Sequence, residues 1–202
     1  MVLLMGVMFA LALDFILGEA KRFHPLVGFG NLATFIEQGL NSRQSSKASG
    51  ILAYVLVVMP FVVLSILITL YFQGNVYIQT LFSGSILYFA IGWQSLLQHA
   101  QAISKPLKVG DLKSARYAVS MIVSRDTQAL DEPGIASAAT ESVLENGSDA
   151  IFSAIFWFLI AGVPGVVLYR LSNTLDAMWG YKTERFLQFG WAAARIDDVL
   201  NF

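Results

Sequence analysis

The chain has 202 residues and no cysteine. Without a thiol it can form no disulfide bond, no cysteine-ligated zinc site and no thiolate nucleophile. Charged residues are also scarce, at 13% against about 25% in a typical soluble domain. The 13 basic and 14 acidic side chains nearly cancel, which argues against a nucleic-acid-binding protein, because such proteins carry an excess of positive charge.

Common nucleotide-binding and hydrolase motifs are absent as well. The sequence contains neither the phosphate loop G-x-x-x-x-G-K-[ST] nor the dinucleotide motif G-x-G-x-x-G. It also lacks the G-x-S-x-G nucleophile elbow and the H-E-x-x-H zinc helix. A nucleotide would therefore have to be bound in another way, by arginine, backbone amides and Mg²⁺ held by carboxylates.

Apolar residues, by contrast, make up 56% of the chain. A globule of this size cannot bury so much apolar surface, so part of it must face lipid. The run 51–72 has no charged residue and, at about 1.5 Å per helical residue, is long enough for a hydrocarbon core of roughly 30 Å. We therefore predict one domain, 1–202, of the all-α class: a polytopic helical membrane protein with cytoplasmic amphipathic helices. The predicted apolar spans are 1–17, 51–72, 76–97 and 151–169.

Basic residues predict how these spans are oriented, because Lys and Arg concentrate in cytoplasmic loops. The short turn around Gly74 and Asn75, which should join the second and third spans into a helical hairpin, has none and is expected outside. The segments 18–50 and 98–150 are rich in basic residues and are expected in the cytoplasm. These residues are Lys21, Arg22, Arg43, Lys47, Lys105, Lys108, Lys113, Arg116 and Arg125.

The last apolar run, 151–169, has two interpretations. If it crosses the membrane fully, the basic residues that follow it lie outside, against the charge rule. Gly162, Pro164 and Gly165 instead allow a broken helix, whose freed backbone groups can be buried in protein. We therefore predict a re-entrant segment that turns back. The residues then brought to the cytoplasmic side, beside Glu141, are Asn173, Asp176 and Asp198.

The segment 98–150 is the longest water-compatible stretch and has a helical pattern. Apolar residues at three- and four-residue spacing predict an amphipathic helix from Leu112 to near Ser124. Asp131 is a good N-cap for a second helix, with Glu132 and Pro133 in its first turn. We therefore expect two helices in this segment.

Three carboxylates form a row on this second helix. Glu141, Glu145 and Asp149 follow one another at four-residue spacing and therefore share a face. One interpretation is a solvated acidic surface. The other is that the row holds a cation or the ammonium group of a substrate, which would relieve the repulsion between like charges. The second is favoured because the row runs directly into an apolar span.

Other polar residues are candidates by their setting. Asp14 is an ionisable group in an apolar span, which indicates a functional site; the alternative is a carboxylate at a helix end that reaches the membrane interface. His24 could be a ligand, although a lone loop histidine is more often structural. His99 has no partner pattern and is given no role. The remaining candidates are Asn173 and Asp176, one turn after Arg170, and the pair Asp197 and Asp198.

Four stretches of the chain form an ordered set of motifs: A-V-S-M-I-V-S-R-D-T at 118–127, E-S-V-L-E-N-G-S-D at 141–149, Y-R-L-S-N-T-L-D-A-M-W-G-Y at 169–181 and F-G-W-A-A-A-R-I-D-D-V-L-N at 189–201. In this set the chain resembles the CobD/CbiB family of cobalamin biosynthesis. The segment L-A-L-D at 11–14 is also similar to the first span of this family. The likeness covers nearly the whole chain, and four ordered motifs of this length are highly specific.

This resemblance implies an adenosylcobinamide-phosphate synthase, a multi-pass protein of the inner (cytoplasmic) membrane. Such enzymes join aminopropanol, or its phosphate, to the propionate carboxyl of adenosylcobyric acid, forming an amide with ATP and Mg²⁺. The implied partners are these two substrates, the lipid bilayer and other enzymes of the cobalamin pathway, with no nucleic acid. Family members run on beyond the last motif, so we expect the chain to be C-terminally truncated.

The implied reaction gives the candidate residues their expected roles. A carboxylate must be activated, most simply as an acyl phosphate, before an amine can attack it, which calls for charge stabilisation rather than a covalent nucleophile. The expected catalytic residues are Glu141, Glu145, Asp149 and Asp176. The expected substrate- or phosphate-binding residues are Arg125, Asp126, Asn146, Asn173, Tyr181, Arg195 and His24, and the expected metal ligands are Asp14, Asp197 and Asp198.

Two other classes of function remain as alternatives. A membrane sensor of the AmpE type is distantly similar to this family, but it would not need the complete acidic set. A small-molecule transporter also uses carboxylates within the membrane and broken helices. Internal pseudo-symmetry would favour the transporter, and the sequence has no such repeat.

Overall fold

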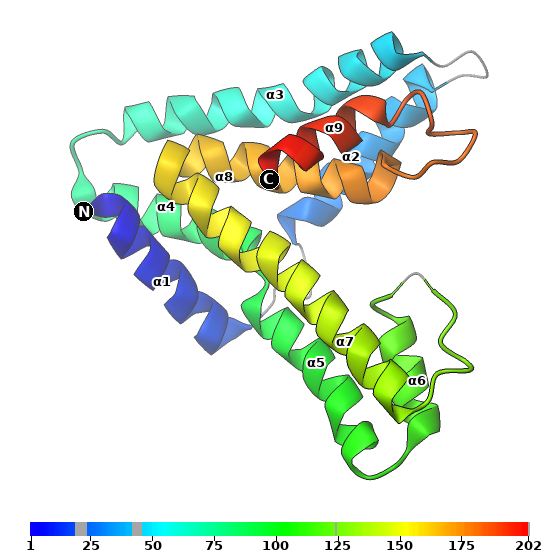
Figure 1. Cartoon of the computed structure of the whole chain (residues 1–202). Helices are drawn as coiled ribbons and strands as arrows, with labels where there is room; N and C mark the ends of the chain where they lie inside the picture. The colour runs from blue at the N-terminus through cyan, green and yellow to red at the C-terminus, as the bar shows by residue number, and fades with distance from the viewer. Residues whose placement is uncertain (19–23, 42–45, 124, 202) are drawn as a thin grey trace.

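The computed structural model describes residues 1–18, 24–41, 46–123 and 125–201, and these contain helices and no strand. The predicted all-α class is therefore confirmed (Figure 1). The elements are α1 (Val2–Leu17), α2 (Pro25–Leu40), α3 (Lys47–Tyr71), α4 (Val76–Ala90), α5 (Trp93–Lys108), α6 (Leu112–Ser120), α7 (Glu132–Gly147), the π-helix η1 (Ser148–Ser153), α8 (Ala154–Trp179) and α9 (Trp191–Leu200).

Three helical stretches are long and apolar enough to cross a membrane: Lys47–Tyr71, Val76–Lys108 and Glu132–Trp179. The shorter helix α1 is also apolar. Large apolar side chains remain exposed along α1 and α3, which suits contact with lipid tails rather than with water. These stretches are those of a helical membrane protein, as the sequence predicts.

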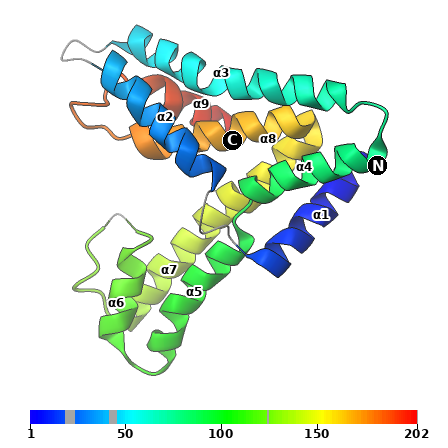
Figure 2. The ribbon, with the colours of Figure 1, turned by 180° about the vertical axis from the view of Figure 1, so that it is seen from behind.

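Helix α8 lies at the centre of the bundle and packs against α2, α3, α4 and α9. One core cluster gathers around Trp179, Phe189 and Leu175, on the side of α3 and α9. A second gathers around Phe158 and Tyr169, on the side of α4 and α1. Viewed from behind, α1 runs along α4 (Figure 2). The bundle is therefore organised around α8.

The turn predicted around Gly74 and Asn75 joins α3 to α4, as expected for the second and third spans (Figure 2). Asn75 does begin α4, since its side chain accepts a hydrogen bond from the Ile78 N–H at 3.1 Å. However, α3 packs mainly on α8, and α4 packs mainly on α1. The run 76–97 is also not one helix, because the backbone leaves the helical conformation at Ile91 and Gly92. Sequence periodicity alone does not show which helices are partners.

Helix α2 lies in the segment 18–50, which connects the first two predicted apolar spans. It begins after His24, whose Nδ1 accepts a hydrogen bond from the Leu26 N–H at 3.2 Å, and Pro25 occupies its first position, where proline is favoured. The helix packs against α3 and α8. The polar segment therefore adds a helix to the bundle.

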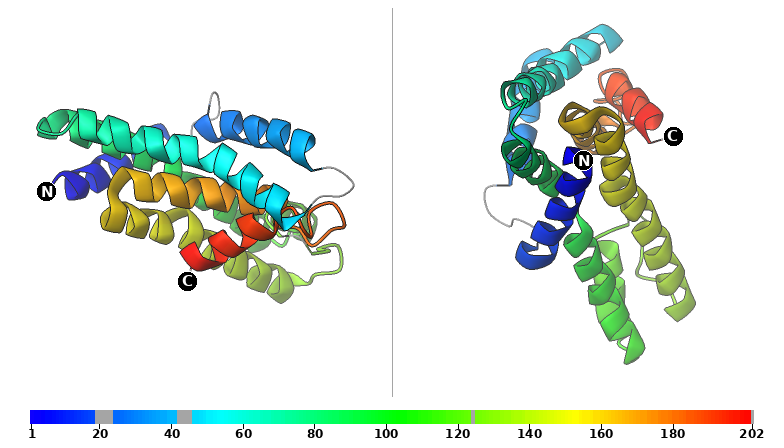
Figure 3. Two further views of the ribbon diagram at one scale, coloured as in Figure 1. Left: turned by 90° about the horizontal axis from the view of Figure 1, so that it is seen from above. Right: turned by 90° about the vertical axis from the view of Figure 1, so that its left-hand side faces the viewer.

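Helices α5, α6 and α7 form an arm that leaves the bundle, with α5 and α7 side by side (Figure 3). Helix α7 begins as predicted, because the Asp131 side chain accepts a hydrogen bond from the Gly134 N–H at 2.9 Å. Helix α6 ends at Ser120, earlier than the periodicity indicated, and Ser124 lies outside the described residues. The arm has its own core of Ile103, Ala115, Val119, Ile135 and Ala138.

The last apolar run is broken at Gly162, one of the glycines that indicated a break. Gly162 has φ 66° and ψ −151°, a conformation open to glycine but strained for other residues. The chain reverses there, so the two halves of α8 form a hairpin (Figure 1). A Cβ at Gly165 would lie 2.5 Å from the Trp157 carbonyl oxygen, so only glycine allows the halves to pack this closely. The re-entrant placement of this hairpin in a membrane stays a prediction.

The two ends of the bundle differ in character. At one end the Gly162 break lies beside Val2, Leu70 and Gln79 in an apolar groove. At the other end lie the start of α3 and the α8–α9 connection, where the Lys47 ammonium is 4.6 Å from the centre of the Trp191 ring. The end with Lys47 is the one that the sequence predicts to face the cytoplasm, and the orientation stays a prediction. Of the basic residues used for that prediction, Lys21, Arg22 and Arg43 lie outside the described residues.

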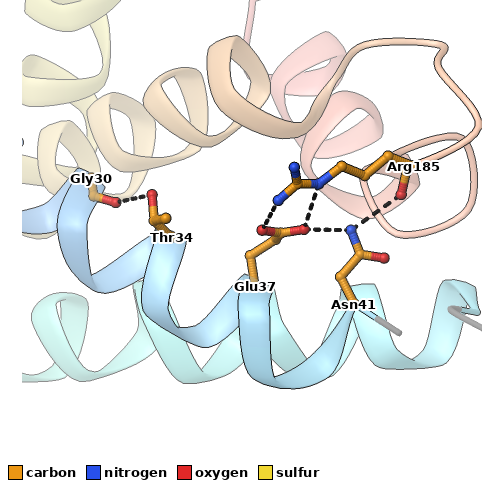
Figure 4. Close-up of polar contacts among 5 residues, drawn as sticks. All are labelled: Gly30, Thr34, Glu37, Asn41 and Arg185. Atoms are coloured by element: carbon orange, nitrogen blue, oxygen red, sulfur yellow. Dashed lines mark hydrogen bonds and ion pairs between the residues drawn. The ribbon is translucent and has the colours of Figure 1, made fainter. Parts of the chain in front are cut away.

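A buried carboxylate ties α2 to the α8–α9 connection (Figure 4). Glu37 is 3% exposed and accepts hydrogen bonds from Arg185 Nε at 3.1 Å and Nη2 at 2.6 Å. Asn41 Nδ2 donates to Glu37 Oε1 at 2.5 Å and to the Arg185 carbonyl oxygen at 3.1 Å. Burial acts to raise the pKa of Glu37, but the hydrogen bonds from Arg185 and Asn41 outweigh it and hold this pKa below its ordinary value.

We expect Arg185→Gln to lower the thermal unfolding midpoint at neutral pH by several degrees, because it leaves the buried Glu37 carboxylate without its charged donor. A lowered folded-state pKa means that the pair stabilises the fold above the ordinary glutamate pKa and loses this effect as the pH falls through the folded value. Wild type and variant should therefore converge as the pH falls through the folded-state pKa of Glu37, which lies below its ordinary value. Circular dichroism melts in detergent over a pH series measure both effects.

Arg195→Gln is the matched control for this change. Arg195 Nη1 lies 3.7 Å from Asp198 Oδ2, and both side chains are exposed, so little stability should be lost. Equal losses in the two variants, or a difference that persists at low pH, would contradict the role given to Glu37.

The orientation is tested by single cysteines introduced into this cysteine-free chain. Cysteines at Ser46 and Lys108, both exposed, should resist a membrane-impermeant thiol reagent in intact cells and react after lysis. A cysteine at Gln73, in the exposed turn before α4, should react in intact cells. Labelling of the first two from outside, with Gln73→Cys protected, would reverse the orientation.

Candidate functional site

An open cavity of about 1140 Å³ lies where the arm meets the bundle. Its walls come from α5, α7, η1, α8 and α9, with the α6–α7 connection and the residue that caps α2. The reversal at Gly162 carries the second half of α8 back to η1, which puts Asn173 and Asp176 on the same cavity as Asp149. The predicted site residues that line it are Glu145, Asn146, Asp149, Asn173, Asp176, Tyr181, Asp197, Asp198 and His24.

The π-helix η1 fixes one wall of this cavity. In a π-helix the hydrogen bonds run from i to i+5, and such turns are frequent at functional sites. Here the carbonyl oxygen of Asp149 lies 2.8 Å from the Tyr169 hydroxyl, and that of Ala150 accepts a hydrogen bond from the Gly92 N–H at 3.2 Å. The wide turn therefore binds both α8 and the start of α5.

The same tyrosine extends the network to α9. The Tyr169 hydroxyl also lies 2.8 Å from Asn201 Oδ1, and Asn201 Nδ2 donates to Asp197 Oδ2 at 3.0 Å. The other oxygen of Asp197, Oδ1, is buried and has no partner within hydrogen-bond distance among the described residues. Burial raises the pKa of Asp197, and the charge of Asp198 adds to this, although Asn201 and the nearby Asn173 act in the opposite direction.

The charge of the cavity lining is strongly acidic. Arg170 is the cation that lines it among the described residues, and its Nη1 donates to Asn173 Oδ1 at 3.3 Å. Five carboxylates face this single guanidinium. Such a lining favours a bound cation or ammonium group by Coulombic attraction. The carboxylates are Glu145, Asp149, Asp176, Asp197 and Asp198.

The predicted acidic row is only partly brought to the cavity. Glu145 and Asp149 line it, but Glu141 does not. Glu141 Oε2 instead accepts a hydrogen bond from Arg125 Nη2 at 2.8 Å, and both side chains are exposed. Asp126 closes the neighbouring turn by accepting from the Gln128 N–H at 2.9 Å. Glu141, Arg125 and Asp126 therefore lie on the surface of the arm, outside the cavity, and the roles expected for them stay predictions.

The metal set expected from the sequence is not assembled either. Asp14 is 2% exposed, and its Oδ2 accepts a hydrogen bond from the Gln94 N–H at 3.1 Å. The first N–H groups of a helix lack partners within it, so Asp14 caps α5 and does not line the cavity with Asp197 and Asp198. Arg195 also lies outside the cavity, on an apolar groove beside α3. Over the described ranges, no three His, Asp or Glu side chains are grouped so as to hold a metal ion.

Several lining residues were missed by the sequence reasoning. His99 and Ser95 share a face of α5 and both line the cavity, but an isolated histidine in a helix carries no motif. Ser142 and Asn201 were also passed over, because a serine and a terminal asparagine are common in any helical surface. For Arg170 the sequence predicts no role beyond its place one turn before Asn173. Their positions follow from how α5, α8 and α9 meet, which the sequence does not show.

The chain is similar to a set of curated proteins of one name. The protein called "Cobalamin biosynthesis protein CobD" of Stutzerimonas stutzeri is 54% identical over 200 residues, covering 98% of this chain and 65% of its own length. The proteins of the same name from Chromobacterium violaceum and Rhodobacter capsulatus are 50% and 40% identical, covering 96% and 95% of this chain and 63% of their own lengths. The chain thus spans a little under two thirds of these relatives. No solved structure matches it.

The family comparison agrees with these relatives. The model described as "CobD/Cbib protein" matches residues 7–202, which include every motif named above and all the helices that line the cavity. The chain therefore belongs to the CobD/CbiB family.

Proposed function

We propose that this protein acts in cobalamin biosynthesis as an amide synthase of the cytoplasmic membrane, the adenosylcobinamide-phosphate synthase. It would join aminopropanol, or its phosphate, to the propionate carboxyl of adenosylcobyric acid at the expense of ATP. The names of its relatives support the pathway. The observation that carries the reaction type is the large cavity with an acidic lining, because its walls gather residues from all four family motifs.

The size and lining of the cavity suit the proposed substrates. A volume of about 1140 Å³ is above the usual range of small-molecule sites, about 300–1000 Å³, as a large substrate such as a corrinoid acid would require. The lining also contains apolar residues that can contact the macrocycle: Ile91, Leu96, Met121, Ile122 and Val123. The carboxylates of the same cavity can hold the ammonium group of the amino alcohol.

The proposed chemistry has two steps. First, the substrate carboxylate attacks the γ-phosphorus of ATP, so that a C–O–P linkage forms and ADP leaves. The amine nitrogen then attacks the acyl carbon, a C–N bond forms, and phosphate leaves with the electron pair of the C–O bond. Both steps depend on positioning and charge stabilisation, for which Arg170 can contact phosphate oxygens.

Mg²⁺ fits this site as a companion of the phosphates. Magnesium is commonly held by one or two carboxylates together with substrate phosphates and water, so no closed protein cage is needed. The ion would be held by Asp197, whose Oδ1 is buried and has no partner among the described residues, and by the adjacent Asp198. When bound, it would neutralise charge on the transferring phosphoryl group.

We expect Asp149→Asn to reduce amide synthesis about a hundredfold, the scale of removing one electrostatic contact in a preorganised site. Glu132→Gln is the matched control: Glu132 is an exposed carboxylate at the start of α7 and does not line the cavity, so its rate should stay near wild type. Membranes containing each protein are supplied with adenosylcobyric acid, aminopropanol phosphate, ATP and Mg²⁺, and the product is measured by mass spectrometry. Equal rates for the two variants would reject the role of Asp149, and no product from wild type would reject the function.

A further inference from the structure

The histidine that the sequence left without a role lines the cavity in a defined protonation form. His99 is exposed on α5, and its Nδ1 lies 2.8 Å from the Ser95 carbonyl oxygen. A carbonyl oxygen can only accept, so Nδ1 must carry the proton that is donated. In the neutral ring the lone pair is then at Nε2. His99 therefore offers the cavity a proton acceptor on its α5 wall.

The proposed amide synthesis needs such an acceptor, and this inference rests on that proposed function. A primary amine enters as an ammonium ion, which has no lone pair and cannot attack a carbonyl carbon. The acidic lining of the cavity stabilises this ammonium form, because nearby negative charges favour a positive group. The same carboxylates that bind the amine therefore oppose its activation, and a separate base must remove a proton.

Imidazole is better suited to this task than the carboxylates. General-base catalysis is most effective when the base titrates near the working pH, and histidine is the side chain that ordinarily does so. His24 also lines the cavity, but its Nδ1 accepts a hydrogen bond from the Leu26 N–H, so its neutral ring carries the proton on Nε2. The charged groups that share the cavity with His99 are Glu145 on α7, Asp149 on η1, Arg170 and Asp176 on α8, and Asp197 and Asp198 on α9.

We propose that His99 is the general base that deprotonates the amine substrate. Nε2 takes one proton from the ammonium group, which frees the nitrogen lone pair for attack on the acyl phosphate. As the C–N bond forms and the C–O bond breaks, phosphate leaves with that electron pair and takes up the second proton lost by the nitrogen. The imidazolium of His99 then releases its proton to water, since the cavity is open.

The test separates amine activation from carboxylate activation. Hydroxylamine is uncharged at neutral pH, so it traps an acyl phosphate as a hydroxamate without needing a base. In His99→Asn the side-chain amide can still donate to the Ser95 carbonyl oxygen, but the acceptor at Nε2 is gone. We expect this variant to form the corrinoid hydroxamate at close to the wild-type rate and the amide with the amino alcohol about a hundredfold more slowly. Added imidazole should restore amide synthesis in His99→Ala.

Each other result has a defined meaning. Gln101→Ala, an exposed position of α5 outside the cavity, is the matched control and should leave both rates unchanged. Equal losses of hydroxamate and amide in His99→Asn, or wild-type amide synthesis in it, would overturn the role of His99 while leaving the proposed function standing. If the wild-type protein forms neither hydroxamate nor amide, the proposed function fails and this inference fails with it.

Discussion

The reversal of the chain at Gly162 is the constraint on which the rest of the molecule depends. A single residue in a left-handed conformation turns an apolar run into two antiparallel halves, and Gly165 lets them pack closely. Without this turn, Asn173 and Asp176 would lie at the far end of a straight helix, about 30 Å from Asp149 if that helix crossed a bilayer. With it, residues from two separate motifs line one cavity.

The junction of the arm with the bundle contains backbone and side-chain polar groups that need partners in a largely apolar protein. The structure satisfies them where the elements meet. The π-helical carbonyls of Asp149 and Ala150 contact Tyr169 and Gly92, and Asp14 caps the start of α5. Most polar groups at this junction are thereby paired, and Asp197 Oδ1 is a buried exception. A cavity whose walls are held in place by these hydrogen bonds is preorganised for a charged ligand.

The sequence was most informative where one residue determines local geometry. Asp131 as a helix cap, the break at Gly162 and the helical class all follow from short-range rules. It was least informative where the answer depends on which helices pack together. Glu141 and Glu145 are equivalent in a helical repeat, yet only Glu145 lines the cavity, while Glu141 pairs with Arg125 on the exposed surface of the arm. The role of Asp14 likewise depends on where the distant helix α5 begins.

The way in which α5 starts has a consequence for how the chain can vary in length. The Gly92 N–H donates a hydrogen bond to η1, and the Gln94 N–H donates one to Asp14. The rotation of α5 about its own axis is therefore fixed at its first residues. One residue inserted between Gly92 and His99 would rotate everything after it by about 100° about the helix axis. His99 would then leave the cavity while the helix itself remained intact. An insertion in the α6–α7 connection would not rotate α7 in this way, because η1 fixes the rotation of α7 about its axis from the other end.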